Sequence, residues 1–230
     1  MMPGGQINLA SAPPEKAKTA WMIDDLVKIC REEGVEIKLN TPATVEAIKK
    51  LSPCAVIAAT GSRPIKPRFA GNCPAEDILT FEDILSGRVE LRDCNVAVIG
   101  SGLTGLETLC ENGCKVTVVE MAKEIAPGTW MQHKDDILPK LKKAGTKIMT
   151  GEKLCEVYTD RIVTENVDTK KRTDIACDRV VLSLGSRPDA TIVEELKKNG
   201  FSPLVIGDAN HVGKIAHATK AAYEAAISVK

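Results

Sequence analysis

The sequence predicts an α/β protein with parallel sheets, organised as two related halves. Strand-like apolar runs alternate with helical patterns along most of its 230 residues, which is typical of parallel sheets. The tetrapeptide Gly-Ser-Arg-Pro occurs twice, at 61–64 and 185–188, each time after an apolar run. Between the two copies, the strand-like run 96–99 leads into a Gly-x-Gly-x-x-Gly turn. The repeat indicates two related halves, and the glycine turn occurs in one place.

Composition excludes several classes of protein. Lys plus Arg and Asp plus Glu number 31 each, so no basic field favours nucleic acid or anionic lipid. No apolar run approaches the ~20 residues that span a bilayer, and the first residues lack a signal-peptide pattern, so we expect a cytoplasmic protein without membrane partners. The basic run 170–172 is flanked by acids, which indicates a solvated hairpin tip.

The eight cysteines and three histidines show no metal-ligand spacing, so we expect free thiols, no metal, and packing or surface roles for the histidines. Cys110 and Cys114 are four residues apart at the end of an expected helix. They could share one face of that helix, which leaves a redox disulfide as an alternative.

The first part of the chain contains helical and strand-like patterns. We expect a helix at 15–33, a strand at the alternating segment 35–39, a helix or turn at 44–51 and a strand at 54–59. Prolines and glycines then punctuate residues 63–95, which indicates a crossing between domains. We therefore expect one discontinuous domain at 1–90 and 191–230, with a second domain inserted at 91–190.

The inserted domain shows alternating strands and helices. Strands are expected at 96–99, 115–120, 146–150 and 179–184, and helices at 103–112 and 133–144. Segments 155–163 and 166–177 predict a short antiparallel meander. The last part predicts a helix at 190–199, a strand ending at 204–208 and a helix from about 216.

The glycine turn is followed by a helix, a second strand and an acid, Glu120, 20 residues after Gly100. Gly100 permits the tight turn, Gly102 lets a pyrophosphate approach the backbone, and Gly105 allows helix and strand to pack closely. The N–H groups that open the helix attract phosphate. We therefore expect an NAD site comprising Gly100, Ser101, Gly102, Leu103, Thr104, Gly105, Glu120, Met121 and Gly185. The alternative is a structural turn that binds nothing.

Glu120 is expected to accept hydrogen bonds from an adenosine ribose, and its charge would repel a 2′-phosphate, which favours NAD over NADP. Lys123 is close in sequence and weakens this preference. An exposed carboxylate at a strand end is the alternative for Glu120.

Several motifs, occurring in order, resemble the C-terminal nucleotide-binding region of the NADH:flavin oxidoreductases. These motifs are GGQ at 4–6, AATGSRP at 58–64, VIGSGLTGLE at 98–107, VVEMAKEIAPG at 118–128, SLGSRP at 183–188 and VIGDA at 205–209. That family includes 2,4-dienoyl-CoA reductases, enoate reductases and trimethylamine dehydrogenase, and the resemblance covers nearly the whole chain.

The resemblance implies two Rossmann-like domains arranged as in glutathione reductase, with an NAD domain inserted into a discontinuous FAD domain. The matching flavin residues would be Gly4, Gly5, Gln6, Thr60, Gly61, Gly207 and Asp208. From the residues alone, Gly207 and Asp208 also fit an ordinary strand-to-turn ending.

The sequence departs from the family pattern in two ways. By the resemblance, we expect the sequence to start after the family's first flavin-binding strand, glycine turn and helix and to be without the barrel that carries FMN and an iron–sulfur cluster, and we therefore expect weak or absent FAD binding. The segment between Gly105 and Gly113 holds seven residues, which allows a helix of only about two turns.

The sequence therefore predicts the pyridine-nucleotide-binding portion of an NADH-dependent flavoprotein oxidoreductase, which passes hydride from NADH to a flavin and needs no protein acid or base. The alternative is an NAD(H)-binding module without redox activity, because its flavin site is incomplete. A disulfide reductase lacks the adjacent cysteine pair that its chemistry requires.

Overall fold

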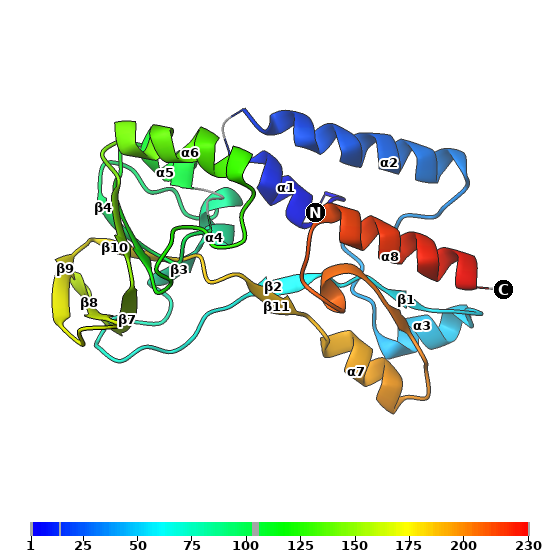
Figure 1. Cartoon of the computed structure of the whole chain (residues 1–230). Helices are drawn as coiled ribbons and strands as arrows, with labels where there is room; N and C mark the ends of the chain where they lie inside the picture. The colour runs from blue at the N-terminus through cyan, green and yellow to red at the C-terminus, as the bar shows by residue number, and fades with distance from the viewer. Residues whose placement is uncertain (1, 14, 103–105, 230) are drawn as a thin grey trace. The chain divides into compact units, whose positions relative to one another are not determined.

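The computed structural model describes residues 2–13, 15–102 and 106–229 and divides into two compact units. Unit 1 comprises residues 1–6, 24–64 and 186–230, and unit 2 comprises residues 7–23 and 65–185. The helical segments that begin the chain are α1 (Gln6–Ser11), the 3-10 helix η1 (Ala17–Ala20) and α2 (Trp21–Glu32) (Figure 1). The single helix expected at 15–33 is thus a 3-10 turn followed by an α-helix.

Unit 2 is built on a five-stranded, entirely parallel sheet in the order β3-β10-β4-β5-β6. Its strands are β3 (Ile78–Thr80), β4 (Asn95–Ile99), β5 (Lys115–Glu120), β6 (Lys147–Thr150) and β10 (Arg179–Leu182). A three-stranded antiparallel sheet consists of β7 (Glu152–Val157), β8 (Arg161–Asn166) and β9 (Arg172–Ala176). The predicted α/β class, with parallel strands and a small antiparallel meander, is confirmed.

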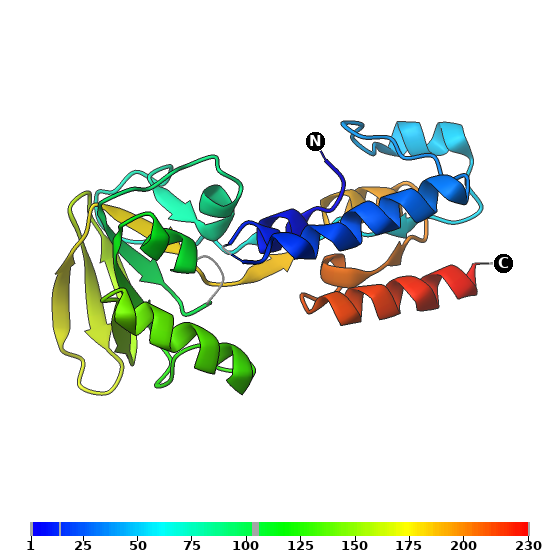
Figure 2. The same cartoon turned by 90° about the horizontal axis from the view of Figure 1, so that it is seen from above.

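The central strands are apolar on both faces because both faces of the parallel sheet are covered. Val96 and Val98 of β4 pack with the helices α4 (Phe81–Leu85), α5 (Leu106–Glu111) and α6 (Met131–Lys143). Ala97 and Ile99, which point the other way, pack with the antiparallel strands β7–β9. Figures 1 and 2 show α5 and α6 on one side of the sheet and β7–β9 on the other.

The described part of the helix after the glycine turn, α5, ends at Glu111, within one residue of the predicted end. Its apolar side chains Leu106 and Leu109 are fully buried. This part of the helix therefore contacts the core of unit 2.

Residues 65–90 pack with the parallel sheet. Strand β3 pairs with β10, and the helix α4 that follows it contributes Phe81 and Ile84 to the helix-side core. The sequence placed these residues with the first domain, whereas in the structure they belong to unit 2.

Unit 1 contains short strands and peripheral helices. The parallel pair β1 (Ile57–Ala58) and β12 (Leu204–Val205) has only two residues in each strand. Its other elements include most of α2 together with α3 (Val45–Leu51), α7 (Thr191–Lys198), the 3-10 helix η2 (Gly207–Ala209) and α8 (Ile215–Ser228). No helix among the described residues is both long and apolar enough to cross a membrane.

The two Gly-Ser-Arg-Pro copies pair with each other. Strands β2 (Ser62–Pro64) and β11 (Ser186–Pro188) are antiparallel, with Arg63 opposite Arg187. The repeat therefore marks two of the places where the chain passes between the units.

The strand expected at 35–39 is wrong, because residues 35–38 have no regular secondary structure and a turn follows. Val35, Ile37 and Leu39 are all substantially exposed. Alternation makes a strand only where a neighbouring strand supplies hydrogen bonds, and no described strand pairs with this segment.

Candidate functional site

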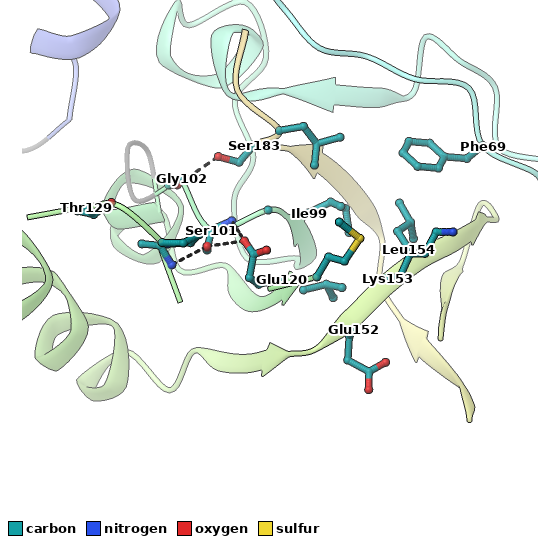
Figure 3. Close-up of a pocket in the computed structure, with 16 residues that line it drawn as sticks. Phe69, Ile99, Ser101, Gly102, Glu120, Thr129, Glu152, Lys153, Leu154 and Ser183 are labelled. Carbon is teal, nitrogen blue, oxygen red and sulfur yellow. Dashed lines mark hydrogen bonds between the residues drawn. The ribbon is translucent and has the colours of Figure 1, made fainter. Parts of the chain in front are cut away.

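A cavity of about 430 Å³ opens in unit 2 where β4, β5 and β10 end. The carboxyl ends of neighbouring parallel strands meet at one edge of a sheet, which is where α/β proteins bind ligands. The cavity wall includes five of the predicted NAD-site residues: Gly100, Ser101, Gly102, Glu120 and Met121 (Figure 3).

Gly100 makes the turn out of β4 in a conformation that favours glycine. Its φ is 91°, and its N–H donates to the Val119 carbonyl at 2.8 Å. A Cβ at this position would lie 2.4 Å from the carbonyl oxygen of Ser183. Both the backbone conformation and the approach of the chain after β10 therefore require glycine here.

Gly102 is exposed at the cavity. Ser183 occupies the space that a side chain at this position would need. The Ser183 hydroxyl donates to the Gly102 carbonyl at 3.2 Å, and a Cβ on Gly102 would lie 2.4 Å from that hydroxyl oxygen (Figure 3). The lack of a side chain thus leaves the backbone open to the cavity and accommodates a neighbouring serine.

Glu120 ends β5 and is held by three hydrogen bonds. Its Oε2 accepts the backbone N–H of Ser101 at 2.9 Å and also the Ser101 hydroxyl, while its Oε1 accepts the N–H of Ala122 at 2.7 Å. Ser101 Oγ in turn accepts the N–H of Ala126 at 2.7 Å. The acid is therefore not an unbound surface carboxylate but is fixed against the glycine turn (Figure 3).

One described residue of the predicted NAD site does not line the cavity. Gly185 is not among the lining residues, and its carbonyl accepts the N–H of Ile65 at 3.0 Å. Leu103, Thr104 and Gly105 lie outside the described residues, so the role of their N–H groups stays a prediction.

Two lysines are candidates to neutralise the Glu120 carboxylate, Lys123 close to it in sequence and Lys153 in the cavity wall. The ammonium of Lys123 forms an ion pair with Asp168 at 3.0 Å. Lys153 lines the opposite wall, and Figure 3 shows its side chain well separated from the Glu120 carboxylate. Neither of these two described lysines therefore forms an ion pair with Glu120.

The sequence did not identify several residues of the cavity wall. Phe69 and Leu154 form an apolar part, and Ser183 and Thr129 supply hydroxyl groups. The position of Ser183 directly after β10 was a usable signal, because it places this residue beside the end of β4. A mainly apolar wall with a few placed polar groups is typical of small-molecule sites.

In unit 1 two of the predicted flavin residues, Gln6 and Asp208, are joined through the hydroxyl of Ser62, which the sequence did not single out. Gln6 Nε2 donates to Ser62 Oγ at 2.6 Å, and that hydroxyl donates to Asp208 Oδ2 at 3.2 Å. Asp208 Oδ1 accepts the N–H of Gly213 at 3.0 Å, just before α8. A Cβ on Gly61 would lie 4.0 Å from Gln6 Nε2.

The remaining predicted flavin residues have separate surroundings. Gly4 and Gly5, which precede α1, have positive φ. Gly207 lies close to α8, since a Cβ added to it would be 3.4 Å from the Cβ of Ala218. Thr60 instead donates to the Asp189 carbonyl at 2.7 Å.

Asp189 organises the chain after β11. Its carboxylate accepts hydrogen bonds from Thr191 and from Arg63, the latter at 2.7 Å. These interactions lower the pKa of the Asp189 carboxyl below its usual value. Asp189 therefore remains charged, and it links β2 to the start of α7.

The cysteine pair considered from sequence is not the pair that the fold brings together. Cys110 Sγ lies 3.4 Å from Thr146 Oγ1, whereas Cys114 Sγ lies 3.8 Å from Cys94 Sγ. Cys94 and Cys114 precede β4 and β5, which are adjacent, so strand pairing rather than helix spacing determines their proximity. The described residues include no cluster of three or more His, Cys, Asp and Glu side chains arranged for a metal ion.

Comparison with known proteins finds relatives that match most of this chain. An NADH oxidase of Thermoanaerobacter brockii is 38% identical over 233 residues, covering 97% of this chain and 35% of that protein. A bilirubin reductase of Mediterraneibacter gnavus is 33% identical over 215 residues, covering 90% of this chain and 32% of that protein. The chain thus spans about a third of the length of these relatives.

A solved structure of a 2-naphthoyl-CoA reductase in complex with 2-naphthoyl-CoA superposes with a TM-score of 0.87 at 27% identity. The match covers 99% of this chain and 34% of that one. The family model of the pyridine nucleotide-disulphide oxidoreductases matches residues 14–202, which include both Gly-Ser-Arg-Pro copies and the glycine turn. The chain therefore belongs to the pyridine nucleotide-disulphide oxidoreductase family.

Proposed function

We propose that unit 2 binds NADH and that the protein to which it belongs uses this NADH to reduce a flavin. The observation that carries the proposal is the cavity at the ends of β4, β5 and β10, where the exposed Gly102 backbone and the fixed Glu120 carboxylate line the same space. A dinucleotide needs both features, because its pyrophosphate requires close access to backbone and its ribose offers hydroxyl donors.

Each group in the cavity has a defined task in this proposal. The turn at Gly100 and Gly102 admits the pyrophosphate, and Glu120 accepts a hydrogen bond from the adenosine ribose. Phe69 and Leu154 provide an apolar wall for a ring of the nucleotide. These residues bind and orient, and bound NADH would supply the hydride that a flavin accepts.

NADH is proposed rather than NADPH because of the charge beside the ribose position. A 2′-phosphate would meet the Glu120 carboxylate, and the nearest lysine in sequence, Lys123, is already paired with Asp168. The same proposal assigns Leu103, Thr104 and Gly105 to the pyrophosphate and keeps Gly185 as a predicted contact.

We also propose that unit 1 belongs to an FAD-binding domain and that the natural protein carries a further barrel domain with FMN and an iron–sulfur cluster. The chain from Gln6 through Ser62 to Asp208 supports the first part, because it joins three segments of the resemblance. The greater length of the relatives supports the second. The cytoplasmic location expected from the sequence stays a prediction.

The binding proposal is tested by titrating the full chain with NADH and following nucleotide fluorescence and calorimetric heat. We expect saturable binding that Glu120→Ala weakens. Glu124→Ala is the matched control, because it removes the same charge from an exposed residue of the loop after β5 that does not line the cavity. Absence of NADH binding to the unaltered chain, or equal weakening by both variants, would contradict the proposal.

A second candidate function is an NAD(H)-binding module without redox activity. The short β1–β12 pair favours it, because Ile57 and Leu204 remain 41% and 37% exposed on a sheet of only two strands. Such a two-stranded pair is marginally stable by itself, which favours a unit 1 that does not hold FAD.

The two functions are distinguished by adding FAD to the chain, removing free FAD by gel filtration and then adding NADH. A flavin spectrum that is retained by the chain and is bleached by NADH supports the reductase. NADH binding without retained flavin supports the module.

A further inference from the structure

We propose that Ser101 is a positioning residue that makes the cavity select NADH over NADPH, by holding Glu120 in its ribose-facing orientation. This inference rests on the proposed function, because it concerns the same nucleotide site. Ser101 is 3% exposed, so its hydroxyl hydrogen bonds form inside the protein rather than with solvent.

The orientation of the Ser101 hydroxyl is fixed because the group both donates and accepts a hydrogen bond. It donates to Glu120 Oε2 and accepts the N–H of Ala126 at 2.7 Å. The backbone N–H of the same residue donates to the same carboxylate oxygen at 2.9 Å. Ser101 therefore holds Oε2 from two sides and connects the glycine turn, the end of β5 and the loop after it.

Among the described residues, the hydrogen bonds to Glu120 leave one acceptor position available to a ligand. An ionised carboxylate offers about four acceptor positions. Two on Oε2 are occupied by Ser101, and one on Oε1 is occupied by Ala122 N–H at 2.7 Å. The remaining position is on Oε1, which we infer to be the oxygen that accepts the ribose hydroxyl.

The loop that Ser101 holds is strained, which indicates that its position matters. Ala126 has a φ of 47°, in the left-handed region that favours glycine, and it is buried in the cavity wall. A non-glycine residue keeps this conformation only where its surroundings impose it. The Ser101 hydroxyl provides one such constraint, so the same side chain fixes both the acid and the wall beside it.

The experiment compares dissociation constants for NADH and NADPH in the full chain. We expect Ser101→Ala to weaken NADH by about tenfold and to leave NADPH within about twofold, because it removes one of the two Ser101 hydrogen bonds to Oε2 and so holds the carboxylate less firmly. Ser183→Ala is the matched control. It removes a hydroxyl from the same cavity that bonds Gly102 rather than Glu120, so the ratio of the two constants should stay unchanged.

A double-mutant cycle separates positioning from general support of the fold. If Ser101 acts through Glu120, then adding Ser101→Ala to Glu120→Ala changes the ratio no further. Equal weakening of both nucleotides by Ser101→Ala, or an undiminished effect in the Glu120→Ala background, would overturn the inference. A change of ratio in Glu120→Ala alone would still support the proposed function, whereas absence of binding in the unaltered chain would remove both.

If Ser101→Ala does not fold, as checked by circular dichroism, Ser101→Thr and Ser101→Val provide the same comparison. Both add bulk at a buried position, and only threonine retains the hydroxyl. Retained selectivity for NADH in the threonine variant and lost selectivity in the valine variant is the expected result. Equal selectivity in the two variants would overturn the inference.

Discussion

Replacing Gly102 with alanine separates two reasons for a glycine at this position. A Cβ there would lie 2.4 Å from Ser183 Oγ but 3.6 Å from the Ser183 carbonyl oxygen, so the close contact involves only a rotatable hydroxyl. The Gly102 backbone also lines the cavity in which we place the nucleotide pyrophosphate. The substitution can therefore act on a protein neighbour or on the ligand.

The expected effect on stability is small. Rotation of the Ser183 hydroxyl forfeits its 3.2 Å bond to the Gly102 carbonyl, which costs about 0.5–1.5 kcal/mol. Gly102 lies outside the left-handed region, so alanine recovers about 0.4–1 kcal/mol by restricting the unfolded chain. The two contributions nearly cancel. By contrast, a methyl group that meets a pyrophosphate cannot be relieved by a side-chain rotation, and we expect a loss of about 10- to 100-fold in NADH affinity.

The assay measures thermal unfolding and NADH affinity for Gly102→Ala, for Ser183→Ala and for the double variant. If the methyl group meets the nucleotide, removing the Ser183 hydroxyl does not restore binding. Recovery of NADH affinity in the double variant would refute the reasoning, and so would unchanged affinity in Gly102→Ala. Gly100→Ala is the contrasting variant. Its Cβ would meet backbone atoms at a φ of 91°, so it should lower the unfolding temperature.

Three further predictions follow from the structure. Glu120→Ala should lower the ratio of NADH to NADPH affinity, and an unchanged ratio in calorimetry would remove Glu120 from the ribose site. Burial raises the pKa of Asp83, but hydrogen bonds from the start of α4 and a nearby arginine outweigh it and lower the pKa overall. The ionised Asp83 carboxylate therefore stabilises the fold above its unfolded-state pKa, and this stabilisation is lost as the pH falls through its folded-state pKa. Asp83→Asn should lower the free energy of unfolding, measured in urea, by about 1 kcal/mol near neutral pH and by less in acid. Burial is the main cause that raises the pKa of Cys94 and of Cys177 to about 11. The exposed Cys54 should therefore react with a thiol reagent well before either of them at about pH 8. Early labelling of Cys94 would contradict this order.

Many elements of unit 2 were predictable because their signals are local. The runs 96–99 and 115–120 are apolar, bounded by turn residues and separated by a helical pattern, and they form β4 and β5. The turn at Gly100, with its positive φ, was predictable for the same reason, since glycine tolerates this backbone conformation. The segment 35–39 shows the limit of such signals, because its alternation lacks the partner strand that would complete it.

The contacts of the site depend on residues distant in sequence. Glu120 could be proposed as a ribose acceptor from its spacing, but its bonds to Ser101 required knowledge that β4 and β5 are adjacent and parallel. Phe69 gave no signal at all, because nothing in its own segment indicates that it faces the ends of these strands. The Cys94 and Cys114 contact has the same origin.

The sequence by itself determined the α/β class, the glycine turn, the acid that follows it and the positions of the two repeated tetrapeptides. These features are encoded in neighbouring residues, through side-chain periodicity and the backbone freedom of glycine. Only the tertiary structure decided that the two tetrapeptides pair with each other and that Ser101 holds Glu120 in place. Strand order and register bring such groups together across long stretches of chain, and a hydrogen bond forms only when both partners reach the same point in space.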